Sequence, residues 1–125
     1  MASDQDLAVF VREHLRSVWA VELLLVLRRD AERCWSTPEL VKELRASTGL
    51  VTTNLQLFER GGLIVVDERG CARFSPAAPV LAELCDRLAT AYRERPVSII
   101  NLIAQPRDPL RSLADAFRFK RGDEE

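Results

Sequence analysis

Residues 36–76 constrain the fold of this chain more than any other stretch. Their sequence is STPELVKELRASTGLVTTNLQLFERGGLIVVDERGCARFSP. Capping residues come first, then two runs with apolar residues at helical spacing, then a double glycine and two short segments suited to strands. We therefore expect a capped helix, a turn, a second helix and a β-hairpin, in that order.

The first helix of this stretch has a clear start. Ser36 or Thr37 can cap it, while Pro38 stands at or near the first helical position, where its missing N–H is not needed. Glu39 favours the helix dipole, and with Ser36 as the cap it completes a capping box. The inward face consists of Leu40, Val41 and Leu44. Trp35, directly before the cap, is expected to anchor the first turn rather than to bind a ligand.

The second helix is expected over residues 50–60. The helix before it should end near Ser47, and Thr48 with Gly49 should make the sharp turn, because glycine accepts a positive φ at little cost. The apolar positions at helical spacing are Leu50, Leu55 and Phe58, with Leu57 or Val51 at the edges. Four polar residues are then left toward solvent, namely Thr52, Thr53, Asn54 and Gln56.

The β-hairpin should follow the double glycine at 61–62, which stops the second helix. Residues 63–66 (LIVV) are β-branched enough for a strand, and residues 67–70 (DERG) suit a hairpin turn. Residues 71–74 (CARF) form the returning strand, which Pro76 closes.

This order of elements resembles the winged-helix repressors of the MarR and PadR type, in which helix, helix, GGL, strand, wing and strand follow one another. The resemblance covers roughly residues 18–75, inside a winged-helix core placed at 17–76. The fold class that it implies is mainly α with a small β-hairpin wing. We expect a winged helix-turn-helix with extra N- and C-terminal helices, in a single domain over residues 1–125.

Helices are also expected on both sides of this core. Residues 4–16 are amphipathic, and the run that starts at Ser17 is apolar nearly all round, which is typical of a buried helix. The later helices are expected at 80–93, at 97–104, where a strand is the alternative and Pro96 favours a helix, and at 110–119. In this family pattern, the flanking segments 4–16 and 78–119 would serve packing or dimerisation.

The resemblance also implies a function, that of a DNA-binding transcriptional regulator acting as a homodimer on a palindromic site. The helix at 50–60 would enter the major groove, and the wing at 67–73 would reach the backbone or the minor groove. Asparagine and glutamine can pair bidentately with adenine, and threonine can contact a thymine methyl group or a phosphate. The residues expected to touch double-stranded DNA are Ser36, Thr37, Lys42, Arg45, Thr52, Thr53, Asn54, Gln56, Arg69 and Arg73.

The charge of the chain does not by itself indicate DNA. The net charge is −1, whereas a strongly basic domain is the usual footprint of a nucleic-acid partner. Residues 50–59 contain no lysine or arginine, and Glu59, Asp67 and Glu68 lie near the expected contact surface. The alternative is therefore a winged helix that acts as a protein–protein interaction module, a regulatory adaptor that does not bind DNA. A third hypothesis is a small effector between Trp19, Trp35 and Tyr92, although core packing explains these aromatic residues as well.

Other chemistry finds little support in the sequence. There is no glycine-rich phosphate loop, nucleophile elbow or paired-carboxylate signature, and the single histidine, His14, has no partners in the pattern. Cys34, Cys71 and Cys85 are widely spaced, so we expect small, partly buried residues rather than metal ligands, with a redox-sensing thiol as the alternative. We expect no enzyme activity, cofactor or metal.

The cytoplasm is the expected location. The longest apolar run, near residues 18–27, is broken by Glu22 and is too short to span a bilayer, and the first residues lack the basic region of a signal peptide.

Overall fold

Six helices and one β-hairpin follow one another along residues 3–104, which are the residues that this computed structural model describes. Their order is α1 (Asp4–His14), α2 (Val18–Arg29), α3 (Thr37–Leu44), α4 (Thr48–Arg60), β1 (Ile64–Val66), β2 (Ala72–Phe74), α5 (Pro79–Glu94) and α6 (Pro96–Ala104). The mainly helical fold with a small antiparallel hairpin, predicted from the sequence, is confirmed. The helix expected at 110–119 lies outside the described residues.

Serine side chains start the first four helices. Ser3, Ser17, Ser36 and Ser47 each accept a hydrogen bond from the backbone N–H three residues further on. These bonds satisfy donors that have no partner inside the helix. At Ser36 the predicted capping box is complete, because the Ser36 N–H also donates to Glu39 at 2.8 Å. The sequence therefore fixes where α3 begins through local chemistry.

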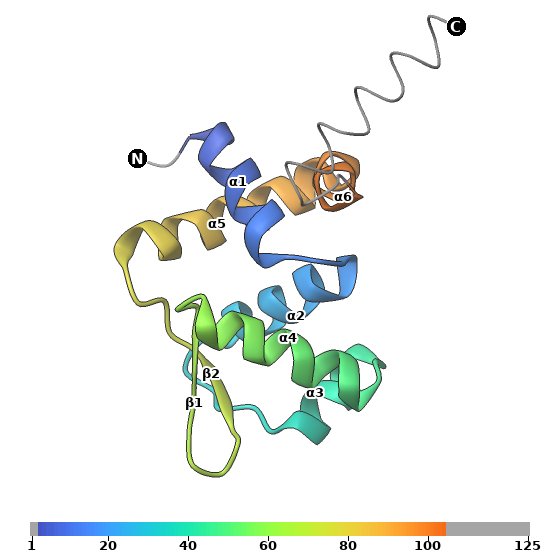
Figure 1. Ribbon diagram of the computed structural model, residues 1–125, viewed down its shortest axis with the longest axis vertical. Helices are drawn as coiled ribbons and strands as arrows, with labels where there is room; N and C mark the ends of the chain where they lie inside the picture. Colours follow the sequence, from blue (N-terminus) through green and yellow to red (C-terminus); the bar gives the residue numbers. More distant parts are fainter. Residues whose placement is uncertain (1–2, 105–125) are drawn as a thin grey trace, which may run out of the picture.

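Helix α2 is the centre of the molecule. Its buried side chains are Ala20, Val21, Leu23, Leu24, Val26 and Leu27. It contacts α3, α4, β2 and α5. Figure 1 shows α1, α5 and α6 at one end, α3, α4 and the hairpin at the other, and α2 between them. The expectation of a buried central helix is confirmed, and among the described residues no helix combines the length and apolar character needed to cross a membrane.

The hairpin is extended by a third short segment. β1 and β2 pair antiparallel, with Val65 opposite Arg73. Trp35 then pairs with Ala72 on the outer side of β2 through two backbone hydrogen bonds of 2.7 Å each. The Trp35 side chain is 2% exposed and belongs to the core, and the Arg33 guanidinium lies 3.6 Å from the centroid of its ring. This pairing joins the segment before α3 to the hairpin.

The turn between α3 and α4 differs from the expectation. Helix α3 ends at Leu44, and Arg45 takes the left-handed conformation with φ 54°. Ser47 caps α4, which begins at Thr48, so Gly49 lies inside the helix rather than in the turn. The sequence prediction overlooked Ser47 as a cap and gave the left-handed position to the nearest glycine.

Candidate functional site

The outer face of α4 presents three of the four polar residues expected there. Thr52, Thr53 and Gln56 are exposed. Val51, Leu55 and Phe58 lie on the opposite side of the helix and are buried in the core. This helix therefore offers a row of hydroxyl and amide groups to solvent, on an element whose other side is fixed by packing.

Asn54 does not belong to this row, and the expectation that it faces solvent is wrong. Its side chain is 5% exposed, and its amide nitrogen donates to the Leu50 carbonyl oxygen at 2.9 Å. The physical reason is helical periodicity, since position 54 lies three residues after Val51 and four before Phe58, on the buried face. The same periodicity, applied strictly to the sequence, could have excluded Asn54.

The residues expected on α3 have different environments. Lys42 and Arg45 are exposed. Ser36 and Thr37 are half-buried, and the Ser36 side chain accepts the Glu39 N–H at 3.3 Å. Capping therefore already occupies Ser36, whereas the two cations are accessible.

The hairpin carries the last two expected residues, Arg69 and Arg73, and both are exposed. Arg69 lies in the turn, where its N–H donates to Asp67 Oδ1 at 2.9 Å. Arg73 lies on β2 directly opposite Val65, which is itself exposed. The side chain of Arg73 thus projects from the outer face of the hairpin.

Ion pairing is sparse among the cations of α3, α4 and the hairpin. On α3, α4 and the hairpin, five cations form no ion pair with any residue between 3 and 104: Lys42, Arg45, Arg60, Arg69 and Arg73. Two carboxylates of α3 are instead held by arginines from outside these elements. Glu39 binds Arg33 at 3.0 Å, and Glu43 lies 3.5 Å from Arg29. These elements therefore carry five cations and three carboxylates, Glu59, Asp67 and Glu68, without an ion pair among the described residues, which leaves a small excess of positive charge.

Arg60 is a residue that sequence reasoning missed. It is exposed at the last turn of α4, four residues after Gln56. Residues four apart lie on the same face of a helix. That spacing was the available signal, and it adds a cation to the end of the polar row.

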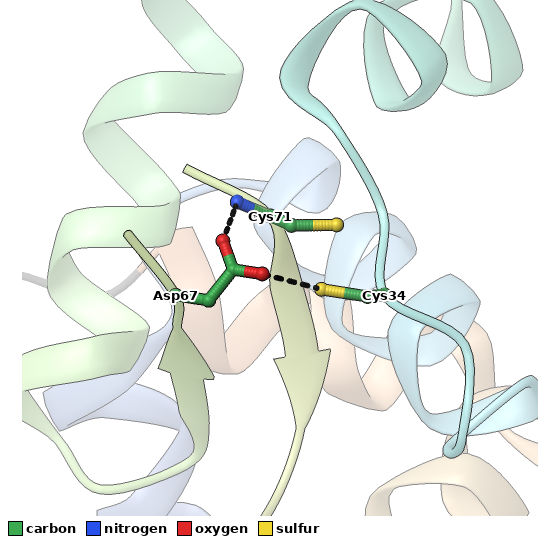
Figure 2. A group of neighbouring side chains, drawn as sticks. All are labelled: Cys34, Asp67 and Cys71. Carbon is green, nitrogen blue, oxygen red and sulfur yellow. Dashed lines mark hydrogen bonds between the residues drawn. The ribbon is translucent and has the colours of Figure 1, made fainter. Parts of the chain in front are cut away.

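A second cluster, formed by Cys34, Asp67 and Cys71, was also missed. One ligand atom from each side chain lies within 4.8 Å of those of the other two. Figure 2 shows the three side chains converging from the connector before α3 and from the two ends of the hairpin turn. Cys34 is exposed and Cys71 is half-buried, whereas Cys85 is buried elsewhere. The sequence spacing of the cysteines gave no signal, because the Trp35–Ala72 pairing brings Cys34 to the hairpin.

Hydrogen bonds shape the protonation of this cluster. The Cys71 and Arg69 N–H groups donate to Asp67 Oδ1, and the bond from Cys71 is the main cause that lowers the pKa of Asp67 below its ordinary value. Loss of solvation, followed by the neighbouring Cys71 thiol and Asp67 carboxylate, raises the pKa of Cys34 to about 12. The cluster therefore combines an ionised carboxylate with a protonated Cys34 thiol.

The histidine and three aromatic residues singled out in the sequence, His14, Trp19, Trp35 and Tyr92, lie outside these two groups. The His14 ring stacks on Phe10, and its Nδ1 lies 3.1 Å from the Phe10 carbonyl oxygen. Trp19 is exposed, Trp35 is buried beneath Arg33, and the Tyr92 hydroxyl donates to Glu22 at 2.7 Å. Burial in the core accounts for the position of Trp35, whose indole Nε1 has no hydrogen-bond partner among the described residues, and the bond to Glu22 accounts for the position of Tyr92.

The chain matches no family model, no curated protein and no solved structure. Its function therefore has to be inferred from its own residues and their arrangement.

Proposed function

We propose that this protein is a DNA-binding transcriptional regulator with a winged-helix fold similar to that of the MarR and PadR types. Helix α4 would be its recognition helix and residues 67–73 its wing. The observation that carries this proposal is the exposed polar row of α4 flanked by cations without ion pairs on α3, α4 and the hairpin. Further support comes from the Trp35–Ala72 pairing. It joins the segment directly before α3 to the hairpin, and so connects the helix pair α3 and α4 with the wing.

Base reading would come from the middle of α4. Gln56 has the donor and acceptor needed for a bidentate contact with adenine, and Thr52 and Thr53 suit thymine methyl groups or phosphates. Each good base contact is worth roughly 1 to 3 kcal/mol of discrimination. Asn54 has no part in this reading, because its amide is committed to the Leu50 carbonyl.

Phosphate contacts would come from the surrounding cations. Lys42 and Arg45 precede α4 in the sequence, and Arg60 is its last residue. Arg69 and Arg73 lie on the hairpin. Phosphate attraction supplies most non-specific affinity for DNA and makes binding depend on salt. These five side chains compensate for the absence of lysine and arginine from residues 50–59.

The functional unit would be a homodimer on a palindromic site. Two copies would double the number of phosphate contacts, which matters for a chain of net charge −1. Apolar side chains remain exposed on α6, where Val97 is 66% and Ile100 is 39% exposed. Such residues suit a contact between two copies.

The test selects bound fragments from random double-stranded DNA and measures affinity for the enriched site by fluorescence anisotropy at several salt concentrations. The Arg73→Ala variant should reduce the salt slope by about 1 while leaving the preferred sequence unchanged. Conversely, Gln56→Ala should relax base preference at one position of each half-site by roughly 1 to 3 kcal/mol. Arg93→Ala, which removes an exposed cation on α5, serves as the matched control and should change neither.

A protein-interaction module is the second candidate. It is favoured by the lack of a cation at residues 50–59 and by Val65, an exposed apolar residue on the hairpin. Failure to enrich any DNA sequence, together with no binding to DNA at low salt, would overturn the regulator proposal and favour this alternative.

A further inference from the structure

The Cys34, Asp67 and Cys71 cluster has the composition of a metal site. Two thiols and one carboxylate supply three ligand atoms that lie within 4.8 Å of one another. Sulfur ligands favour zinc and other thiophilic ions over magnesium and calcium, which prefer oxygen alone. Three protein ligands leave one tetrahedral position for water or another donor. The donor set therefore points to a thiophilic divalent cation.

The distance between Cys34 and Asp67 already suits such an ion. A tetrahedral Zn²⁺, with Zn–S of about 2.3 Å and Zn–O of about 2.0 Å, holds its sulfur and oxygen ligands roughly 3.5 to 3.8 Å apart. The Cys34 sulfur lies 3.7 Å from Asp67 Oδ2, to which its thiol donates a hydrogen bond. Replacing the thiol proton with a metal ion would thus require little movement of these two side chains.

The carboxylate is also held in an orientation that suits a ligand. Asp67 Oδ1 accepts N–H groups from Arg69 and Cys71, both at 2.9 Å, while Oδ2 faces Cys34 (Figure 2). Metal-binding carboxylates are commonly fixed by such hydrogen bonds to the oxygen that does not bind the ion. The hairpin turn therefore supplies the outer support of the site as well as two of its ligands.

The cluster is open to an entering ion. A surface hollow of about 380 Å³ is lined by all three residues, together with Val65, Val66 and Arg73. Arg73 is the one cation among these lining residues, and ionisation of both thiols beside Asp67 would outweigh its charge. Entry therefore needs no rearrangement of the hairpin.

We infer that Cys34, Asp67 and Cys71 form a binding site for Zn²⁺. On binding, the two thiols lose their protons to solvent, and the ion joins two thiolates and one carboxylate. The bound ion cross-links the segment before α3 to both ends of the hairpin turn, which makes the turn more rigid. This site requires no DNA, so it stands independently of the proposed regulator function.

The experiment titrates the reduced, chelator-treated full chain with Zn²⁺ by calorimetry and with Co²⁺ by absorbance, using Mg²⁺ as the comparison ion. We expect one Zn²⁺ per chain, a Co²⁺–thiolate charge-transfer band and no binding of Mg²⁺. Zn²⁺ should also protect Cys34 and Cys71 from alkylation, as read by mass spectrometry of the peptides.

Matched variants separate the site from a general effect on folding. Loss of a residue that only supports a metal ligand typically weakens metal binding ~10- to 100-fold. Cys34→Ser and Cys71→Ser each remove a ligand, so each should weaken Zn²⁺ binding by more than this. Asp67→Asn keeps an oxygen for the turn hydrogen bonds but removes the charge, and it should weaken binding while circular dichroism shows the fold intact. Cys85→Ala, which removes the buried third cysteine, is the control and should bind as the parent chain does.

Two results would overturn the inference. One is unchanged Zn²⁺ affinity and stoichiometry in both Cys34→Ser and Cys71→Ser. The other is a reduced chain that binds no Zn²⁺, with the two thiols forming only a disulfide under added oxidant, because the pair would then be a redox element instead.

Discussion

Tyr92 ties α5 to α2 through one short hydrogen bond. Its hydroxyl donates to Glu22 at 2.7 Å. Loss of solvation, followed by this hydrogen bond and the charge of Glu22, raises the pKa of Tyr92 from 10.0 to about 12. A pKa that is higher in the folded state means that ionisation opposes folding. The contact therefore contributes its full stability below pH 10 and loses it as the pH rises toward 12.

This tyrosine can be titrated alone, because it is the only one in the chain. Absorbance of the tyrosinate should show a midpoint near pH 12 in the parent protein, measured while circular dichroism confirms the fold. In a Glu22→Gln variant the midpoint should move toward 10, since the neighbouring negative charge is gone. The parent should also lose unfolding free energy between pH 10 and 12 more steeply than Tyr92→Phe. A parent midpoint near 10 in the folded protein would contradict this account.

At the scale of elements, the turn between α3 and α4 depends on one unusual residue. Arg45 has φ 54° and ψ 42° at the C-cap of α3, a conformation that usually belongs to glycine. A side chain with a Cβ is strained there by roughly 1 kcal/mol. If Arg45 contacts DNA phosphate as proposed, this strain would be a compromise between backbone geometry and the contact of its exposed guanidinium.

Two substitutions separate strain from charge at position 45. Arg45→Gly should raise the free energy of unfolding by up to about 1 kcal/mol, because it relieves the left-handed strain. Arg45→Ala keeps the Cβ and should not gain this stability. Both should weaken DNA binding equally, since both remove the guanidinium. Urea denaturation and anisotropy titrations measure the two effects, and a less stable Arg45→Gly would refute the strain argument.

The same elements indicate how far sequence reasoning reaches. Local signals placed the start of α3 at Ser36 or Thr37, the hairpin after the double glycine and a helix beside Pro96, because caps, turns and prolines act over a few residues. Asn54 was expected to face solvent, although strict helical periodicity places it on the buried face of α4. The proximity of Cys34 and Cys71 could not be predicted from local sequence patterns. It depends on the pairing of Trp35 with Ala72, two residues far apart in the chain.

At the scale of the whole molecule, the proposed dimer surface and the proposed DNA surface lie at opposite ends (Figure 1). The end with α1, α5 and α6 contains ion pairs that join helices, such as Arg87 with Asp4, and an exposed apolar surface on α6. The other end carries the polar row of α4 and the five cations without ion pairs. Such a division suits a protein that contacts itself with one end and DNA with the other.

The proposed dimer contact can be tested with paired substitutions. Replacing both Val97 and Ile100 by serine should convert a species of twice the chain mass into one of a single chain mass, because apolar area at the contact is lost. Light scattering after size-exclusion chromatography at matched concentrations measures this. Val80→Ser is the control, since Val80 is 51% exposed on α5 and should leave the mass unchanged.

The same double variant links oligomeric state to DNA affinity. If two copies read a palindrome together, losing the dimer removes one set of contacts and also the advantage of joining them, whereas binding to an isolated half-site is unaffected. Affinity for the full palindrome should therefore fall far more than affinity for a half-site. A variant that remains dimeric would exclude α6 as the contact. Equal losses on palindrome and half-site would show that α6 does not act through pairing of the two copies.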